Sequence, residues 1–337
     1  MKKILVSQTA PNAYRTLSEA ILAIEDIPAE PVFITVEPGI YREKVFIAKE
    51  NLTIIGSDPE TTIFCYDDGA KKQREDGSGE YGTFNTAVML LAGKNITVEN
   101  ITVMNTAGPG QLAGQALAIY VAADKTSFQN CRFLGFQDTV FVGDLTNNSL
   151  KKLMLPPYVQ NSPVTIQHKI IRNYFHNCVI SGDVDFIFGP NTAYFDHCEI
   201  VSRKRESESR AFITAASTPA GQEFGLIFNH CHLIGEDEPS SVFLGRPWRD
   251  YAKTAFLNCQ MDDHICPDGW HNWGKEKAEV VSCYVEYNNK GPGADTAGRA
   301  AFSKQLTNPE LDQYFSVQNV FQMPDEWIPP HCPAYLQ

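Results

Sequence analysis

The chain has 337 residues, of which 43% are hydrophobic and 20% are charged. This composition is typical of a folded globular protein and excludes a disordered or fibrous chain. Forty acidic residues against 28 basic ones give a net charge of −12, so the surface repels phosphate backbones and we expect no nucleic-acid partner. A polyanion whose charges are neutralised by esterification remains compatible with this surface.

The N-terminus resembles a targeting signal only briefly. Its apolar run at 4–6 is three residues long, whereas a secretory signal peptide needs about 7–15. No stretch approaches the roughly 18 apolar residues of a membrane span, so we expect no membrane association. Nine cysteines, an odd number without a CxxC pair, favour a reducing compartment. The sequence therefore favours a cytoplasmic protein, and secretion stays open if a leader has been removed.

The first predicted elements are one helix and three strands. Residues 14–25 carry apolar side chains at positions 17, 20, 21 and 24, which is the spacing of one helix face. Residues 32–36, 52–55 and 96–103 are short and rich in β-branched residues, which predicts strands. A helix ahead of many short strands suits an N-terminal cap, at about residues 10–27, that shields an open strand edge.

Five copies of the pattern Phe-x-Asn/His-Cys dominate the middle of the chain. Their cysteines are spaced 47, 20, 33 and 28 residues apart and are Cys131, Cys178, Cys198, Cys231 and Cys259. Such unequal steps indicate a solenoid with loops of varied length, so we expect one all-β domain over 1–337. We expect these thiols to stack inside the coil, with disulfides between coils as the alternative, and the turn asparagines to hydrogen-bond along the stack.

Candidate chemistry rests on two carboxylates, because no GxSxG, HExxH or P-loop motif is present. Asp138 lies in GFQDTVF (135–141) and Asp185 in GDVDFIFG (182–189), both rich in aromatic residues and glycine. Equivalent positions in adjacent coils lie about 4.8 Å apart, so the two side chains are expected to face each other. Two close carboxylates in different surroundings can serve as acid and base, whereas either alone is more readily a structural turn residue.

Other residues complete the candidate site. Arg246 can pair with a carboxylate through two hydrogen bonds, and an exposed Trp248 offers a platform for a sugar ring. Gln115 and Gln137 are amide donors that can hold an oxyanion. Regular alternation puts Gln137 and Asp138 on opposite faces, so a bulge or strand end is expected there. The spacing of the eight histidines predicts no metal site.

Alternation also makes a prediction for the strand around Asp185. It places Val184, Phe186 and Phe188 on one face, and Asp185 with Ile187 on the other.

Five sequence blocks resemble, in order, the signature blocks of the pectin methylesterase (pectinesterase) family. They are GIYRE (39–43), GQALA (114–118), GFQDT (135–139), DFIFG (185–189) and LGRPW (244–248). Residues 251–273 and 286–294 are similar to that family as well, and the resemblance covers about residues 5–325. It implies a right-handed parallel β-helix, in agreement with the repeats, and an esterase that needs no metal or cofactor. The implied substrates are methyl-esterified pectin or oligogalacturonides, from which methanol is released.

The resemblance also implies roles for the candidate residues. Asp185 would attack the ester carbonyl, and Asp138 would protonate the departing methanol and then activate water. Gln115 and Gln137 would hold the oxyanion, and Arg246 would keep Asp185 ionised. The implied sugar contacts are Trp248, Phe188, Phe141 and, more weakly, Thr83. A lowered pKa beside arginine and a raised pKa in an apolar frame are expected for Asp185 and Asp138, respectively.

Two departures from the family pattern matter. Phe141 stands where the family often has tyrosine, and residues 143–169 form an apparent insertion between the aspartates. We expect this insertion to close one end of the groove and to favour short oligosaccharides over the polymer. The alternatives are a polygalacturonase or pectate lyase, the latter with calcium held by acids such as Asp183 and Asp185, and a non-catalytic carbohydrate-binding solenoid. We expect a monomer.

Overall fold

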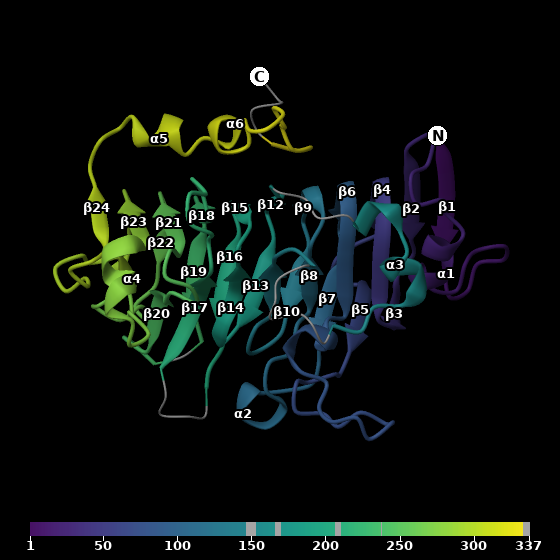
Figure 1. The fold of residues 1–337 in the computed structure, drawn as a ribbon, viewed down its shortest axis with the longest axis horizontal. Coiled ribbons are helices and arrows are strands. Elements are labelled where there is room, and N and C mark those ends of the chain that lie inside the picture. The colour runs from purple at the N-terminus through teal and green to yellow at the C-terminus, as the bar shows by residue number, and fades with distance from the viewer. Residues whose placement is uncertain (146–152, 166–169, 206–209, 237, 333–337) are drawn as a thin grey trace.

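The computed structural model describes residues 1–145, 153–165, 170–205, 210–236 and 238–332. Short strands follow one another around a coil and stack into two long sheets (Figure 1). The ladders of both sheets are parallel, with neighbours along each ladder coming from successive coils. The architecture is therefore a parallel β-helix, which confirms the fold that the repeats predicted.

The two sheets contain sixteen and eight strands. The larger sheet is formed by β1 (Lys2–Val6), β2 (Val32–Val36), β4 (Val45–Gly56), β6 (Met89–Glu99), β8 (Ile119–Val121), β9 (Asp124–Gln129), β11 (Val140–Val142), β12 (Arg172–His176), β14 (Val184–Gly189), β15 (Thr192–Asp196), β17 (Ala211–Ala216), β18 (Leu226–Asn229), β20 (Val242–Gly245), β21 (Lys253–Leu257), β23 (Cys283–Tyr287) and β24 (Lys304–Leu306). The smaller sheet is formed by β3 (Gly39–Arg42), β5 (Thr62–Tyr66), β7 (Thr102–Asn105), β10 (Arg132–Leu134), β13 (Val179–Gly182), β16 (Glu199–Ser202), β19 (His232–Gly235) and β22 (Gln260–Met261).

The helical segments are short. They are α1 (Leu17–Leu22), η1 (Thr83–Thr86), α2 (Gly110–Ala113), α3 (Pro157–Gln160), η3 (Pro163–Thr165), α4 (Glu276–Val281), η4 (Pro292–Ala294), α5 (Leu311–Tyr314) and α6 (Val317–Val320). The strands predicted at 32–36 and 52–55 are confirmed. The single strand predicted at 96–103 is wrong, because the chain turns at Asn100 (φ 55°) and divides it into β6 and β7. Asparagine tolerates this left-handed conformation better than most residues.

Like side chains stack along the inside of the coil. Rings of successive repeats lie 4.5–4.6 Å apart in the series Phe128, Phe175, Phe195, Phe228 and Phe256. The five repeat cysteines are buried in the same core. None of the nine cysteines, all of which are described, forms a disulfide. The predicted thiol stack is confirmed, and the disulfide alternative is wrong.

Asparagines join the coils at one corner. The side-chain amide of Asn130 donates to the Oδ1 of Asn100 at 3.2 Å, and that of Asn177 donates to Asn130 at 2.6 Å. Further along, Asn288 donates to Asn258 at 2.7 Å. These residues adopt left-handed backbone angles, with φ between 50° and 55°. The predicted hydrogen bonding along the stack is confirmed.

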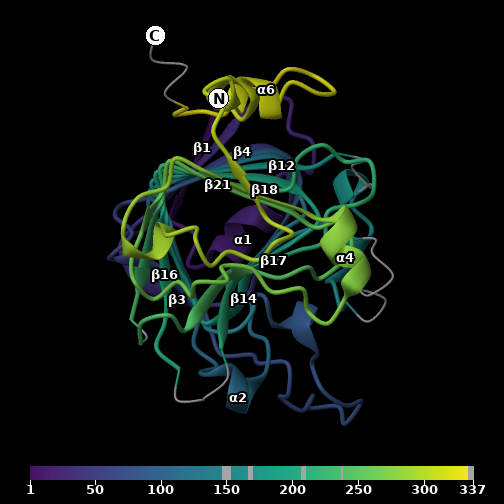
Figure 2. The ribbon, with the colours of Figure 1, turned by 90° about the vertical axis from the view of Figure 1, so that its left-hand side faces the viewer.

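The helix α1 is shorter than the predicted 14–25 but lies within the expected cap. The Thr16 hydroxyl accepts the Glu19 N–H, and the Glu19 carboxylate accepts the Thr16 N–H, which forms a capping box. The buried face of α1 packs into the core inside the outline of the coil (Figure 2). At the other end of the chain, α5 and α6 lie across the outside of the larger sheet (Figure 1). Among the described residues, no helix is long and apolar enough to cross a membrane.

Candidate active site

The two candidate aspartates lie in neighbouring coils. Strands β11 and β14 pair in parallel with Val140 opposite Ile187, a separation of 47 residues that Asp138 and Asp185 share. The backbone N–H of Asp138 donates to the carbonyl of Val184 at 3.0 Å, directly beside Asp185. The equivalent positions expected from the repeats are therefore confirmed.

Neither aspartate has regular strand geometry. Asp138 precedes β11 with φ 64°, and Asp185 lies inside β14 with φ 48°. The register of β14 against β17 shifts between Val184 and Ile187, which marks a bulge. Asp138 thus lies just before a strand, and Asp185 lies in a bulge, so neither side chain follows the regular alternation of a strand. For Asp138, this is the strand end or bulge that the sequence predicted.

The bulge overturns the predicted alternation of β14. Phe186 and Ile187 are both packed in the main core, whereas Phe188 belongs to a separate aromatic cluster. Gly182 makes this possible, because a Cβ there would lie 2.2 Å from the Cβ of Phe186. Strict alternation fails because the bulge at Asp185 adds one residue to the strand, so the side chains after it point to the opposite face from the one predicted.

Arg246 follows β20 and forms an ion pair with Asp185 from two coils away, since β17 lies between β14 and β20. Its Nε donates to Oδ1 at 2.8 Å and its Nη2 to Oδ2 at 2.7 Å. The guanidinium carbon lies 3.8 Å from the ring centroids of both Phe212 and Trp273. The expected ion pair is confirmed, but the sequence did not identify its aromatic clamp, since Trp273 stood out only as the end of a family-like segment.

Burial dominates the proton affinity of both aspartates. It raises the pKa of Asp185 above the ordinary 3.8, although the hydrogen bonds and charge of Arg246 oppose it. The expected lowered pKa is therefore wrong, because lost hydration outweighs the ion pair. For Asp138, burial and then the charge of Asp185 raise the pKa well above its usual range. Among the described residues no cation forms a comparable ion pair with Asp138, so Asp185 loses its proton first.

The two glutamines flank Asp138. The N–H of Ala116 donates to the carbonyl of Gln137 at 3.0 Å, which places Gln115 and Gln137 in adjacent coils. Both side chains are half-buried. The Gln137 side chain packs on Gly110, the first residue of α2, where a Cβ would lie 2.6 Å from its Oε1.

An aromatic cluster lies beside the aspartates. The Trp248 ring is 5.7 Å from Phe188 and 6.3 Å from Phe141, and Phe84 is 4.9 Å from Phe141. Phe141 is completely buried and Phe188 is 3% exposed, whereas Trp248 is half-buried. Of these three expected sugar contacts, Trp248 therefore offers the most accessible ring. The sequence did not single out Phe84.

Thr83 and part of the expected insertion meet at a cavity. Residues 78–85 and Leu153 contribute to the lining of a volume of about 710 Å³. Segment 153–165 is anchored to the earlier coils, with the Met154 N–H donating to Asn85 at 2.7 Å. Insertion residues 146–152 and 166–169 lie outside the described residues.

Comparisons with known proteins agree over most of the chain. A family model described as Pectinesterase matches residues 3–147 and 159–323. The curated protein "Pectinesterase 31" of Arabidopsis thaliana is 32% identical over 98% of this chain and 95% of its own length. Several other curated relatives, with names that combine pectinesterase and pectinesterase inhibitor, are longer, and this chain spans about half of each.

Solved structures show the same similarity. Pectin methylesterase from carrot superposes with a TM-score of 0.79 at 28% identity, covering 95% of this chain and 93% of that one. A pectin methylesterase in complex with a hexasaccharide superposes with a TM-score of 0.78 at 25% identity, covering 98% of this chain and 99% of that one.

Proposed function

Because this chain belongs to the pectinesterase family, we propose that it hydrolyses methyl esters on galacturonate units of pectin or methylated oligogalacturonides. The products are methanol and a free carboxylate. The observation that carries this proposal is the pair of buried aspartates in neighbouring coils, of which Asp185 is bound through both oxygens by Arg246. Unequal surroundings of two close carboxyl groups support one ionised and one protonated member.

In the first half of the reaction, ionised Asp185 attacks the ester carbonyl carbon. The charge that develops on the carbonyl oxygen is stabilised by amide donors from Gln115 and Gln137. Asp138 gives its proton to the methoxy oxygen, so that methanol leaves and an acyl bond to Asp185 remains. The raised pKa of Asp138 supports this role, because the group must hold a proton when Asp185 has lost its own.

In the second half, Asp138 is a carboxylate and takes a proton from water. The resulting hydroxide attacks the acyl carbon, and Asp185 departs as the carboxylate that Arg246 again binds. Asp138 is then protonated for the next cycle, so the net reaction consumes one water and releases one methanol per ester.

Aromatic residues support the sugar. We assign Trp248 the stacking contact, because its ring is the more accessible one and rests on Phe188 and Phe141. The fully buried Phe141 then acts as a support beneath it, and Thr83 contributes from the adjoining cavity. The pectin methylesterase solved with a hexasaccharide shares this fold, which supports an oligosaccharide of several units along the groove.

The insertion is the proposed source of a preference for short substrates. Leu153 and Thr83 line the same cavity, and Leu153 packs against the aromatic cluster, which supports a place for the insertion along the substrate groove. Turnover per ester should be higher on methylated trimers than on long pectin. Equal turnover on the two substrates contradicts this preference.

The charges at the site disfavour a calcium-dependent lyase. Asp183 lies 3.9 Å from the guanidinium of Arg205, and Asp185 is paired with Arg246. A calcium ion between these carboxylates would have to displace or approach two positive groups. A non-catalytic solenoid is also disfavoured, because both members of the aspartate pair are present and buried together.

The decisive experiment measures methanol release from highly methylated pectin, with and without chelator, beside an Asp185→Asn variant. We expect chelator-resistant release, unchanged polymer length, and at least about a thousand-fold loss in the variant. Chain shortening would support a glycosidase or lyase instead. If the wild type releases no methanol from pectin or from methylated oligogalacturonides, the esterase proposal is wrong.

We also propose that residues 1–337 act as one catalytic domain and as a monomer. The main core extends without a break from Ile4 to Tyr284, and α1 covers one end of the coil against edge pairing with a second copy. Light scattering of the purified chain tests the monomer. The cysteines without disulfides are compatible with a cytoplasmic location. Secretion is the alternative, and assay of expressing cells and of their medium distinguishes the two.

A further inference from the structure

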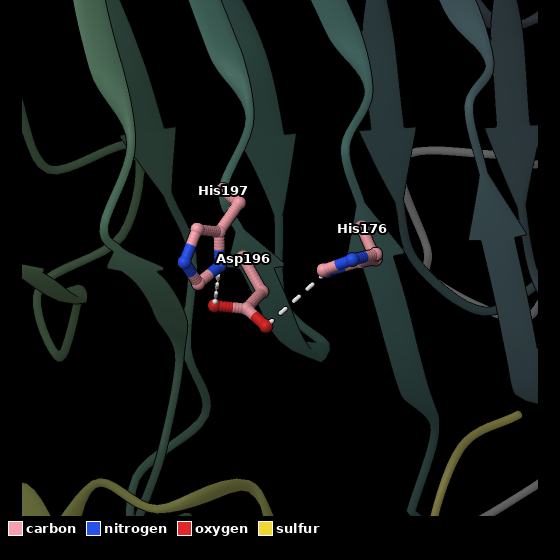
Figure 3. Close-up of side chains that lie close together, drawn as sticks. All are labelled: His176, Asp196 and His197. Atoms are coloured by element: carbon pink, nitrogen blue, oxygen red, sulfur yellow. Dashed lines mark hydrogen bonds and ion pairs between the residues drawn. The ribbon is translucent and has the colours of Figure 1, made fainter. Parts of the chain in front are cut away.

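Three potential metal ligands meet at a corner of the coil away from the aspartate pair. His176 ends β12, Asp196 ends β15, and His197 follows in the turn (Figure 3). Parallel pairing places His176 directly opposite Asp196. The Nδ1 of His176 lies 3.3 Å from Asp196 Oδ2, and the Nδ1 of His197 lies 2.9 Å from Oδ1. One potential ligand atom from each residue lies within 4.8 Å of the other two.

This corner interrupts the asparagine ladder. Asn177 precedes it and Asn258 follows it at the same left-handed turn position, whereas His197 (φ 52°) and His230 (φ 53°) stand in the two coils between. The two imidazoles stack at 5.0 Å. Asparagine adopts this left-handed turn in other coils, so the turn does not require histidine. The histidines therefore add imidazole nitrogens, which can bind a metal, at a position where the fold does not need them.

Asp196 is held as a buried carboxylate. Its residue is 4% exposed, and Oδ2 also accepts the hydroxyl of Tyr174 at 2.8 Å. The Tyr174 hydroxyl thus orients one oxygen of the carboxylate, as outer hydrogen bonds do at metal sites.

The site is open on one side. About half of the His197 side chain is exposed. Asp196, His197 and His230 contribute to the lining of a cavity of about 400 Å³ beside residues 315–318 of the C-terminal segment. Water therefore has room to complete a coordination shell.

We propose that His176, Asp196 and His197 bind a divalent transition-metal ion of the zinc type. Two imidazoles and one carboxylate are the donors that such ions prefer over calcium or magnesium. In a tetrahedral zinc site with bonds of about 2.0–2.1 Å, neighbouring ligand atoms stand about 3.3 Å apart. The distance from His176 to Asp196 matches this value at 3.3 Å, whereas His197 lies nearer to Asp196, at 2.9 Å, and must move outward slightly to bind the ion. The ion ties the turn after β15 to β12 and takes no part in ester hydrolysis.

The test is titration of the untagged, metal-free full chain with Zn²⁺ in a calorimeter at neutral pH, beside two matched variants. His197→Asn and His230→Asn each restore the residue that other coils carry at this turn. The wild type should bind one Zn²⁺ per chain at this site, His197→Asn should weaken binding at least about tenfold, and His230→Asn should bind like the wild type. At the same zinc concentration, zinc should raise the melting temperature of the wild type and His230→Asn by similar amounts, and that of His197→Asn by less.

A Co²⁺ absorption spectrum then identifies the ligands. Bands of nitrogen and oxygen coordination that disappear in His197→Asn support the site. Absence of saturable Zn²⁺ binding, binding that His197→Asn leaves unchanged, or an intense thiolate band that assigns the metal to cysteine would each overturn it. Methanol release does not enter this test, so its outcome is separate from that of the proposed esterase activity.

Discussion

The backbone N–H of Asp138 donates a hydrogen bond to the carbonyl of Val184 at 3.0 Å. Val184 immediately precedes Asp185, so this bond links the two coils at the point where the proposed acid and nucleophile meet. Both aspartates have left-handed backbone angles, which regular strands exclude. The placement of the two carboxyl groups therefore depends on the irregular backbone at Asp138 and at Asp185, and the parallel pairing of β11 with β14 holds the two positions together.

The rate of methanol release should depend on pH in a bell shape. Activity rises with pH as Asp185 ionises. This acid limb lies above pH 3.8, the ordinary pKa of an aspartate, because burial raises the pKa of Asp185. Activity falls again as Asp138 loses its proton, at a pH well above the usual range of a carboxyl group. Initial rates under saturating substrate report both limbs as properties of the coupled pair. A rate that is flat across both titrations would contradict the assigned roles.

Replacing Arg246 by lysine should reduce kcat by about 100-fold or more. An ammonium group forms neither the two parallel hydrogen bonds to Asp185 nor the stack between Phe212 and Trp273. An alanine at this position removes the opposing charge, so the pKa of Asp185 rises further and the acid limb moves to higher pH. Arg132→Lys, on β10 of the smaller sheet, is the matched control with unchanged activity. Wild-type rates in Arg246→Lys would exclude a role for the bidentate pair.

Gly143→Ala should disturb the support beneath Trp248. A Cβ at this glycine would lie 2.2 Å from the Cζ of Phe141, so the ring must move. We expect a loss of about 1–3 kcal/mol in the free energy of unfolding and a raised KM. Phe141→Leu in the same chain makes room for the methyl group, so the double variant should be more stable than the sum of the single effects predicts. Strict additivity in denaturant unfolding would show that the two positions do not collide.

Asp325→Asn should loosen the C-terminal segment. Arg172 is 1% exposed and bonds Asp124 within the coil and Asp325 from the segment at 2.8 Å. Hydrogen bonds from Lys125 and Arg172 lower the pKa of Asp325 to about 2. The ion pairs of Asp325 therefore stabilise the folded protein fully above pH 3.8, the ordinary pKa of an aspartate, and this stabilisation is lost as pH falls through about 2.

Because Asp325 is about half exposed, we expect the variant to lose about 1 kcal/mol or less at neutral pH. Hydrogen exchange should increase in residues 307–332, while the coil stays protected. The neighbouring Glu326→Gln serves as the control. A stability difference between wild type and Asp325→Asn that does not decrease toward acidic pH would argue against the ion pair.

The repeats predicted most of the architecture because a solenoid is encoded locally. The Phe-x-Asn/His-Cys pattern specifies a ring, a turn and a thiol for each coil, and stacking like on like follows from the parallel ladder. The same periodicity relates Asp138 to Asp185 across 47 residues, so the sequence alone identifies them as a candidate pair.

Only the tertiary structure decided the pKa, the aromatic contacts and the direction of the side chains in the site, because these depend on residues from other coils. The pKa of Asp185 rises because burial by surrounding coils outweighs Arg246, and no linear pattern shows how much water is excluded. The clamp on Arg246 joins Phe212 and Trp273 from separate segments, and the bulge at Asp185 breaks the alternation that strand periodicity predicts. Periodicity in the sequence thus determined the coil, while packing between coils determined the charge and direction of the side chains in its site.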